Sequence, residues 1–495
     1  MFQSINGAPV LIQGGMGAAV SGWELARAVS LTGQLGVVSG TAIDVVMARR
    51  LQCGDSGGHV RRALAEFPYP EMVQRILNRY FVAGGKPHNS AFLPNRVLPV
   101  EPTREQQELV VVANFVEVFL AKDEHDGLVG VNYLEKIQTP TLPSLFGAML
   151  AGVDYVLMGA GIPRAIPGIL DRLADGEAVE LSLNVAGARH DDAFVTRFDP
   201  MEFSGGAIPW LQRPKFLAIV ASVSLASILA KKSSGRVDGF VVEGPTAGGH
   251  NAPPRGKGHL NGRGEPVYGV KDEVDLNAIK ALGLPFWLAG SYGSPEQVSA
   301  ALQAGAHGVQ IGTAFAFCDE SGLRSDIKQR VLEMCCDGSV DVVTDPLASP
   351  TGFPFKVVQL SGSLSDDAIN QRRRRVCDLG FLSQAYRKPD GSIGWRCPGE
   401  PVASYLHKGG TIDETVGRKC VCNGLLANVG LEQCRLHGQH ESPLVTSGND
   451  VANIRRFLKT PDARSYSAAD VVKHLLEVNS PVLRKKVMEL PSCLR

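Results

Sequence analysis

Short apolar runs, most of them followed by a helical pattern, recur along the first two thirds of the chain. A continuous apolar run is typical of a strand that is buried on both faces, as in a parallel sheet. We expect eight such strands, at residues 9–13, 34–40, 128–134, 153–158, 216–221, 237–243, 285–289 and 308–311. Eight β-then-α units close into a (β/α)8 TIM barrel of the α/β class. The alternative is an open doubly wound sheet, which needs a reversal of strand order that the pattern does not show.

Three regions depart from this alternation. Residues 41–127, after the second strand, are mostly helical, and residues 178–213 contain an alternating stretch typical of an inserted hairpin. Beyond residue 320 the alternation stops, and helical patterns dominate. We therefore predict a barrel over residues 1–320 with two insertions, and a mostly helical C-terminal extension over residues 321–495.

The composition is that of a globular enzyme. Of 495 residues, 44% are hydrophobic and 20% are charged, and the formal net charge is zero. No overall field therefore favours nucleic acid or an anionic membrane surface. The N-terminus lacks the pattern of a signal peptide, and no window of about 18 apolar residues predicts a membrane span. We expect a cytoplasmic protein whose ten cysteines are reduced.

The best candidate for chemistry follows the sixth expected strand. That strand ends at the acid Glu243, and the loop after it contains Gly248, Gly249 and His250. Paired glycines let a backbone approach a ligand closely because no Cβ is in the way. A lone histidine is most often a surface residue, but the carboxyl end of a barrel strand is where this fold keeps its active site. The Gly/Pro-rich stretch 250–269 is long enough to cover such a site.

Two further glycine loops predict a phosphate site. Gly290 and Ser291 follow the seventh strand, and Gly312 and Thr313 follow the eighth. The loops after these two strands commonly bind phosphate in TIM barrels. The dinucleotide fingerprint, the P-loop and the nucleophile elbow are all absent from the sequence. Flavin mononucleotide (FMN) and pyridoxal phosphate remain, and FMN is favoured because Lys215 stands at the start of a strand, where it is badly placed for a Schiff base.

Several segments together resemble one family of flavin enzymes. They are PVLIQGGMG, VSGWELARAVS, GVNYL, VEGPTAGGH, LAGSYGSPEQVSAALQAGAHGVQIGTAF and, at residues 349–356, SPTGFPFK. In these segments the chain resembles the nitronate monooxygenase (2-nitropropane dioxygenase-like) family of FMN-dependent TIM barrels. That superfamily includes FMN-dependent enoyl-acyl-carrier-protein reductases. The resemblance covers most of residues 9–320 outside the insertions.

The resemblance implies roles for individual residues. His250 matches the catalytic histidine of the family. The implied contacts with the flavin ring, its ribityl chain and its phosphate are Gln13, Gly15, Met16, Asn132, Gly248, Gly249, Gly290, Ser291, Gln310, Gly312 and Thr313. The chain departs from the family at Thr246, where glutamate is usual, at Asn251 after the histidine, and at Gly15, where proline is usual. These departures concern the substrate more than the cofactor.

The resemblance leaves the reaction open. In the monooxygenase interpretation, neutral His250 is a general base with a pKa near the ordinary value of about 6.5, and dioxygen oxidises a small nitronate or nitroalkane. In the reductase interpretation, NAD(P)H is the co-substrate and an acyl-carrier protein presents an enoyl thioester. A specialised pathway oxidoreductase and a non-enzymatic FMN-binding subunit are further alternatives, and a homodimer is an assembly that we leave open.

Four cysteines gather in the extension. Cys377 and Cys397 flank a stretch with a Pro-Asp-Gly turn between two alternating arms, which predicts a hairpin. Cys420 and Cys422 follow it as a C-x-C pair, whose spacing suits a single metal ion poorly. We predict packed thiols here and no metal.

Overall fold

The computed structural model describes residues 8–476, apart from 257, 436–437 and 461. Its centre is a parallel sheet of eight strands in the order β1-β10-β9-β8-β7-β4-β3-β2. These strands are β1 (Leu11–Gln13), β2 (Gly36–Ser39), β3 (Val129–Leu134), β4 (Tyr155–Gly159), β7 (Lys215–Val220), β8 (Gly239–Glu243), β9 (Phe286–Ala289) and β10 (Gly308–Ile311).

The two ends of this sheet meet. A parallel bridge joins Ile12 to Leu35, the backbone N–H of Gln13 donates to the Leu35 carbonyl at 2.9 Å, and the Leu35 N–H donates to the Leu11 carbonyl at 3.1 Å. These contacts close the sheet into a barrel. The predicted (β/α)8 barrel and the positions of its eight strands are therefore confirmed, and the open-sheet alternative is wrong.

The barrel interior is a dry core, as the uninterrupted apolar runs predict. Its largest side chain is Trp287, which is 1% exposed and whose indole N–H donates to the Pro9 carbonyl at 2.8 Å. The cluster around it consists of Ile12, Leu35, Val37, Tyr155, Leu157, Leu217, Val241 and Ala289. Because this core fills the barrel, a ligand can enter only at the strand ends.

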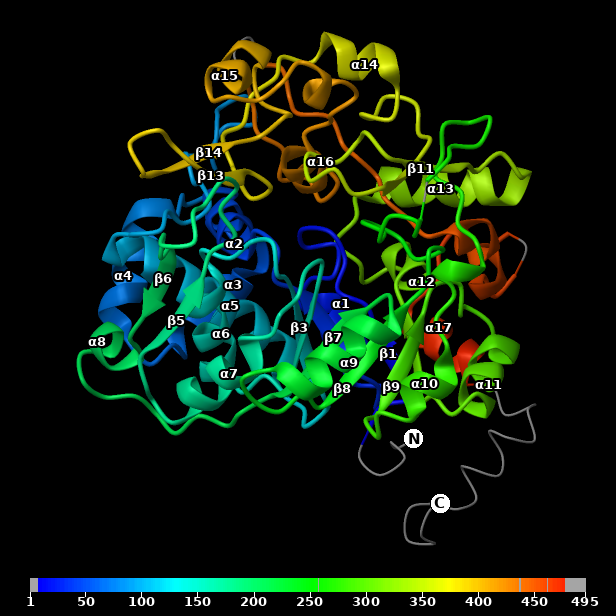
Figure 1. Cartoon of the computed structure of the whole chain (residues 1–495), viewed down its shortest axis with the longest axis horizontal. Helices are drawn as coiled ribbons and strands as arrows, with labels where there is room; N and C mark the ends of the chain where they lie inside the picture. The colour runs from blue at the N-terminus through cyan, green and yellow to red at the C-terminus, as the bar shows by residue number, and fades with distance from the viewer. Residues whose placement is uncertain (1–7, 257, 436–437, 461, 477–495) are drawn as a thin grey trace, which may run out of the picture.

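Helices surround the barrel, as Figure 1 shows. They are α1 (Trp23–Ser30), α5 (Arg104–Lys122), α6 (Thr141–Leu150), α7 (Ile166–Ala174), α9 (Val223–Lys232), α10 (Leu276–Lys280), α11 (Pro295–Gln303) and α12 (Thr313–Ala316). The insertion after β2 adds α2 (Ile43–Gln52), α3 (His59–Ala65) and α4 (Pro70–Tyr80). The second insertion is an antiparallel hairpin of β5 (Val179–Ser182) and β6 (Val195–Phe198), followed by α8 (Pro200–Ser204). Both insertions thus have the predicted character.

The C-terminal extension contains more strand than we predicted. Its helices are α13 (Ser325–Asp337), α14 (Asp367–Arg372), α15 (Val402–His407), α16 (Val421–Ala427) and α17 (Ala468–Leu475), and a 3-10 helix occupies Asn449–Phe457. Two antiparallel pairs accompany them, β11 (Val342–Asp345) with β12 (Phe355–Val358), and β13 (Gln384–Arg387) with β14 (Ile393–Arg396). The second pair is the predicted cysteine-bearing hairpin. In Figure 1 the yellow and orange part of the extension lies above the barrel, while α17 returns to pack against α1, α11 and α12. We propose that the architecture changes near residue 320. We also propose that the extension beyond it is not an independent folding unit.

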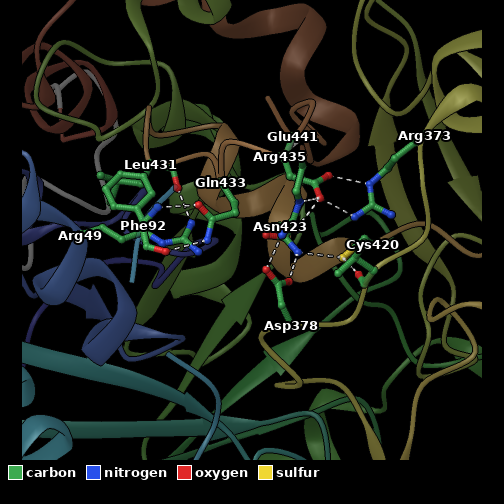
Figure 2. A network of polar contacts seen from close by, with 11 residues as sticks. Arg49, Phe92, Arg373, Asp378, Cys420, Asn423, Leu431, Gln433, Arg435 and Glu441 are labelled. Carbon is green, nitrogen blue, oxygen red and sulfur yellow. Dashed lines mark hydrogen bonds and ion pairs between the residues drawn. The ribbon is translucent and has the colours of Figure 1, made fainter. Parts of the chain in front are cut away.

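A network of charges holds the extension together (Figure 2). The Glu441 carboxylate accepts hydrogen bonds from Arg373 at 2.6 and 2.8 Å and from Arg435 at 2.6 and 2.8 Å. Arg435 also reaches Asp378 at 2.7 Å. Next to this network, Arg49 of α2 donates to the Leu431 carbonyl, so the extension is tied to the helical insertion.

A search of the helices in the described part of the chain found none with the length and hydropathy of a membrane span.

Candidate functional site

A cavity of about 440 Å³ lies at the carboxyl ends of the barrel strands. Its volume is in the range of pockets that hold a cofactor or a small ligand. It brings together almost all of the site residues predicted from the sequence, although they come from five different strand ends. The predicted residues in its lining are Gly15, Met16, Asn132, Gly248, Gly249, His250, Gly290, Ser291, Gln310, Gly312 and Thr313.

Gln13 is the exception, because its side chain lies outside this lining. It is fully buried, its amide oxygen accepts the Val37 N–H at 2.9 Å, and its amide nitrogen donates to the Ser21 hydroxyl at 2.9 Å. The bond to Val37 joins β1 to β2, where the barrel closes. These hydrogen bonds give Gln13 a structural role, and its expected contact with a flavin ring stays a prediction.

The loop after β9 has the backbone that its glycine predicts. Gly290 has a φ of +103°, and a Cβ at this position would lie 2.9 Å from the Thr246 hydroxyl oxygen. Ser291 also has a positive φ, +58°, which is uncommon for a residue with a side chain. Backbone strain of this kind tends to concentrate at ligand-binding positions. The loop therefore presents main chain to the cavity at close range.

One wall of the cavity comes from the C-terminal extension, at residues 446–450, and the sequence analysis missed it. The Gly249 N–H donates to the Thr446 hydroxyl at 3.0 Å, and the Gly448 N–H donates to the Thr313 hydroxyl at 3.0 Å. A Cβ on Gly248 would lie 2.8 Å from the Gly448 nitrogen. Protein packing alone therefore favours glycine at position 248. The only sequence signal for this contact is a short run of small polar residues, Thr-Ser-Gly-Asn-Asp.

His250 is held by the extension as well. Its Nε2 lies 2.6 Å from the Ser349 hydroxyl, and its ring lies 4.6 Å from that of Phe355. Burial, together with the positive charge of nearby Lys136, lowers the pKa of His250 to about 3. The expected pKa near the ordinary value is thus wrong, because the sequence did not show how deeply the ring is enclosed. His250 is neutral throughout the usual working range of pH.

Several buried polar atoms in the cavity wall have no hydrogen-bond partner among the described residues. They are Lys136 Nζ, Asn251 Oδ1, Gln310 Oε1, Asn428 Oδ1 and Ser447 Oγ. Buried polar groups are almost always paired in native proteins, so such atoms indicate a polar ligand. Glu243 also lines the cavity, and burial raises its pKa to about 7.

The four cysteines of the extension line a second, much smaller cavity. Burial raises the pKa values of Cys420 and Cys422. No group of three or more potential ligands in the described part of the chain is arranged to hold a metal ion. The absence of a metal stays a prediction, and Cys422 is also part of the main cavity wall.

Comparison with known proteins gives this geometry a context. Residues 210–347 match the family model named nitronate monooxygenase. The chain resembles the nitronate monooxygenase family. The matched range runs from the residues before β7 to just beyond β11, so it includes Glu243, His250 and both glycine loops. Lys136, Ser349 and the wall formed by residues 446–450 lie outside it.

Individual relatives match over short stretches. A probable nitronate monooxygenase of Bacillus subtilis is 40% identical over 97 residues, which are 20% of this chain and 26% of that protein. A 5-hydroxy-7a-methyl-1-oxo-octahydro-1H-indene-4-carboxyl-CoA dehydrogenase of Mycobacterium tuberculosis is 28% identical over 141 residues, which are 28% of this chain and 35% of that protein. The chain thus spans between a quarter and about a third of the length of these curated relatives. Among solved structures, FabK of Thermotoga maritima aligns over 97% of this chain and 94% of its own, with a TM-score of 0.43 and 15% identity.

Proposed function

We propose that the cavity binds FMN and that the protein is an FMN-dependent oxidoreductase. The observation that carries the proposal is the convergence of His250 and the glycine loops after β9 and β10 on one cavity at the strand ends. The family match over the same loops supports it. The unpartnered Gln310 Oε1 and Ser447 Oγ are suited to a ligand with polar edges, so the residues present fit a flavin.

In this proposal the main chain at Gly290, Ser291 and Gly312 binds the phosphate, because N–H groups near a loop turn favour an anion. Asn132 and Gln310 face the cavity with amide groups that can bond the ring or the ribityl chain. FMN, when bound, supplies the redox chemistry, while the protein provides binding, orientation and electrostatics.

We propose that the substrate is oxidised with dioxygen in the manner of a nitronate monooxygenase, with His250 as the general base for a neutral nitroalkane. A base with a pKa of about 3 accepts a proton from carbon poorly, because efficient proton transfer needs a pKa near the working pH. A nitronate has already lost that proton. We therefore expect the nitronate to be used in preference to its parent nitroalkane.

The experiment begins with the colour of the purified protein. We expect a yellow protein that releases FMN on denaturation, and a colourless protein that takes up no added FMN would refute the cofactor assignment. Oxygen uptake and nitrite are then measured with a nitronate and with its parent nitroalkane. His250→Ala should retain FMN and lower nitroalkane turnover about 10²–10⁴-fold, with a much smaller effect on the nitronate. Equal losses with both substrates would argue against a base role.

A second candidate function is the reduction of an enoyl thioester with NAD(P)H. It is favoured by the match to the Mycobacterium tuberculosis relative, whose name places a CoA thioester in its substrate. In this version an acyl-carrier protein is the partner that presents the substrate. The test is anaerobic reduction of the flavin by NADH or NADPH, followed by addition of an enoyl thioester. Rapid reduction by a nicotinamide, with no response to any nitronate, would replace the first candidate by the second.

A further inference from the structure

Lys136 lines the cavity from the position two residues after the end of β3. Its ammonium nitrogen is buried and lies 3.1 Å from the centroid of the Phe353 ring. No hydrogen bond or ion pair within the described residues reaches this nitrogen. The adjacent Glu135 carboxylate is instead bonded by Gln138 at 3.1 Å and by Asn184 at 3.3 Å. The cation therefore faces a cavity without an anion of its own.

Two other lysines of this protein show that the arrangement is unusual. Lys356 is 2% exposed, and its nitrogen donates to the Thr344 hydroxyl at 2.7 Å. Lys86 lies over the Phe92 ring at 4.2 Å, as Lys136 lies over Phe353, but it donates to the Ser90 carbonyl at 2.7 Å. Burying a charge without a partner is costly, so a position that retains one commonly serves a ligand.

We propose that Lys136 binds the negatively charged oxygen of the substrate next to His250. The proposal rests on the proposed oxidoreductase function and extends it by naming a substrate-binding residue. Lys136 and His250 line the same cavity, and the charge of Lys136 is close enough to influence the protonation of His250. In a nitronate that oxygen is charged from the start, whereas in an enoyl thioester the charge develops on the carbonyl oxygen during reduction.

The charge state of Lys136 predicts how such binding depends on pH. Burial lowers the pKa of Lys136 to about 8, and neighbouring Glu135 acts in the opposite direction. The other titratable groups that line the cavity are His250, which is neutral, Glu243, with a pKa of about 7, Tyr292, whose pKa is raised by burial, Asp450 and Cys422. The ammonium group is thus present below about pH 8 and lost above it. Ionisation of Glu243 adds repulsion of an anion from about pH 7 upward.

The test uses butyrate, a carboxylate with the same two-oxygen shape as a nitronate, and butyramide as its uncharged counterpart. Binding is measured by isothermal titration calorimetry on the full chain, with and without FMN. Lys136→Met should weaken butyrate binding about 10- to 150-fold and leave butyramide within about twofold, because a charged hydrogen bond is lost. Lys136→Arg should keep butyrate binding within a few fold. Lys86→Met, which removes the matched lysine outside the cavity, should bind butyrate like the wild type.

The outcomes separate this proposal from the proposed function. Failure to bind FMN refutes the cofactor assignment, while titration with butyrate still tests Lys136. Equal butyrate affinity in the wild type and in Lys136→Met, or no butyrate binding to the wild type, overturns the proposal. If Lys136→Met does not fold, wild-type butyrate affinity is measured from pH 7 to 10. It should fall about tenfold per pH unit above about pH 8, and a flat profile overturns the proposal.

Kinetics with the two substrate classes identify which oxygen Lys136 binds. With a nitronate, Lys136→Met should raise KM and largely retain kcat, because the charge is bound already in the ground state. With crotonyl-pantetheine and NADPH, the same variant should instead lower kcat, because the charge appears only in the transition state. Unchanged kinetics with whichever substrate the wild type uses contradict the proposal.

Discussion

Replacing Glu441 by glutamine tests the charge network that holds the extension together. The Glu441 side chain is 3% exposed, and those of Arg373 and Arg435 are 11% and 24% exposed. Glutamine keeps the shape but removes the charge, so two guanidinium groups lose the carboxylate that accepts four hydrogen bonds. Breaking a buried pair from one side typically costs about 3–5 kcal/mol. We expect a loss of that size in the free energy of unfolding.

Urea denaturation of the full chain measures this loss, and limited proteolysis locates it. Cleavage should accelerate within residues 360–445 before the barrel is attacked. The matched control is Glu180→Gln in the hairpin insertion, whose partner Arg197 lies 3.4 Å away with both side chains more than half exposed. Exposed pairs contribute about 0–1 kcal/mol, so the control should unfold almost like the wild type. A loss below about 1 kcal/mol for Glu441→Gln would refute the reasoning.

Three further predictions concern the cavity. Gly248→Ala should destabilise the protein by about 1–3 kcal/mol because its Cβ meets the backbone of the extension at 2.8 Å, whereas Gly258→Ala, with open space around it, should melt like the wild type. The pKa of His250 is about 3 in the folded protein, below its unfolded value. Above about pH 6.5 the ring is neutral in both states and burying it costs no protonation energy. As the pH falls, the ring becomes protonated only in the unfolded state, so the free energy of unfolding decreases. His250→Gln should therefore lose less stability than the wild type on acidification, by about 2 kcal/mol at pH 5, and parallel urea curves at pH 7 and pH 5 check this difference. Gly290→Asp should abolish FMN binding through charge repulsion and a clash with Thr246, and retention of flavin absorbance by the variant would contradict the phosphate assignment.

The sequence alone determined the barrel and part of the cavity lining. A strand that is buried on both faces must be apolar along its whole length. The eight apolar runs in the sequence therefore indicate eight buried strands. Glycines at strand ends also carry local information, because Gly290 needs a backbone that other residues rarely adopt. Active sites of TIM barrels lie at the carboxyl ends of the strands, which predicts that His250 and both glycine loops share one cavity.

Only the tertiary structure decided what surrounds these residues. Ser349 contacts His250 and Gly448 contacts Gly248, although these residues lie about 100 and 200 residues further along the chain, and no local pattern encodes such contacts. The pKa of His250 and the unpartnered charge of Lys136 depend on burial and on neighbours in space. The hydrogen bonds of the Gln13 side chain to Val37 and Ser21 likewise depend on how the barrel closes. Local sequence specifies secondary structure and turns, whereas electrostatics and site composition arise from long-range packing.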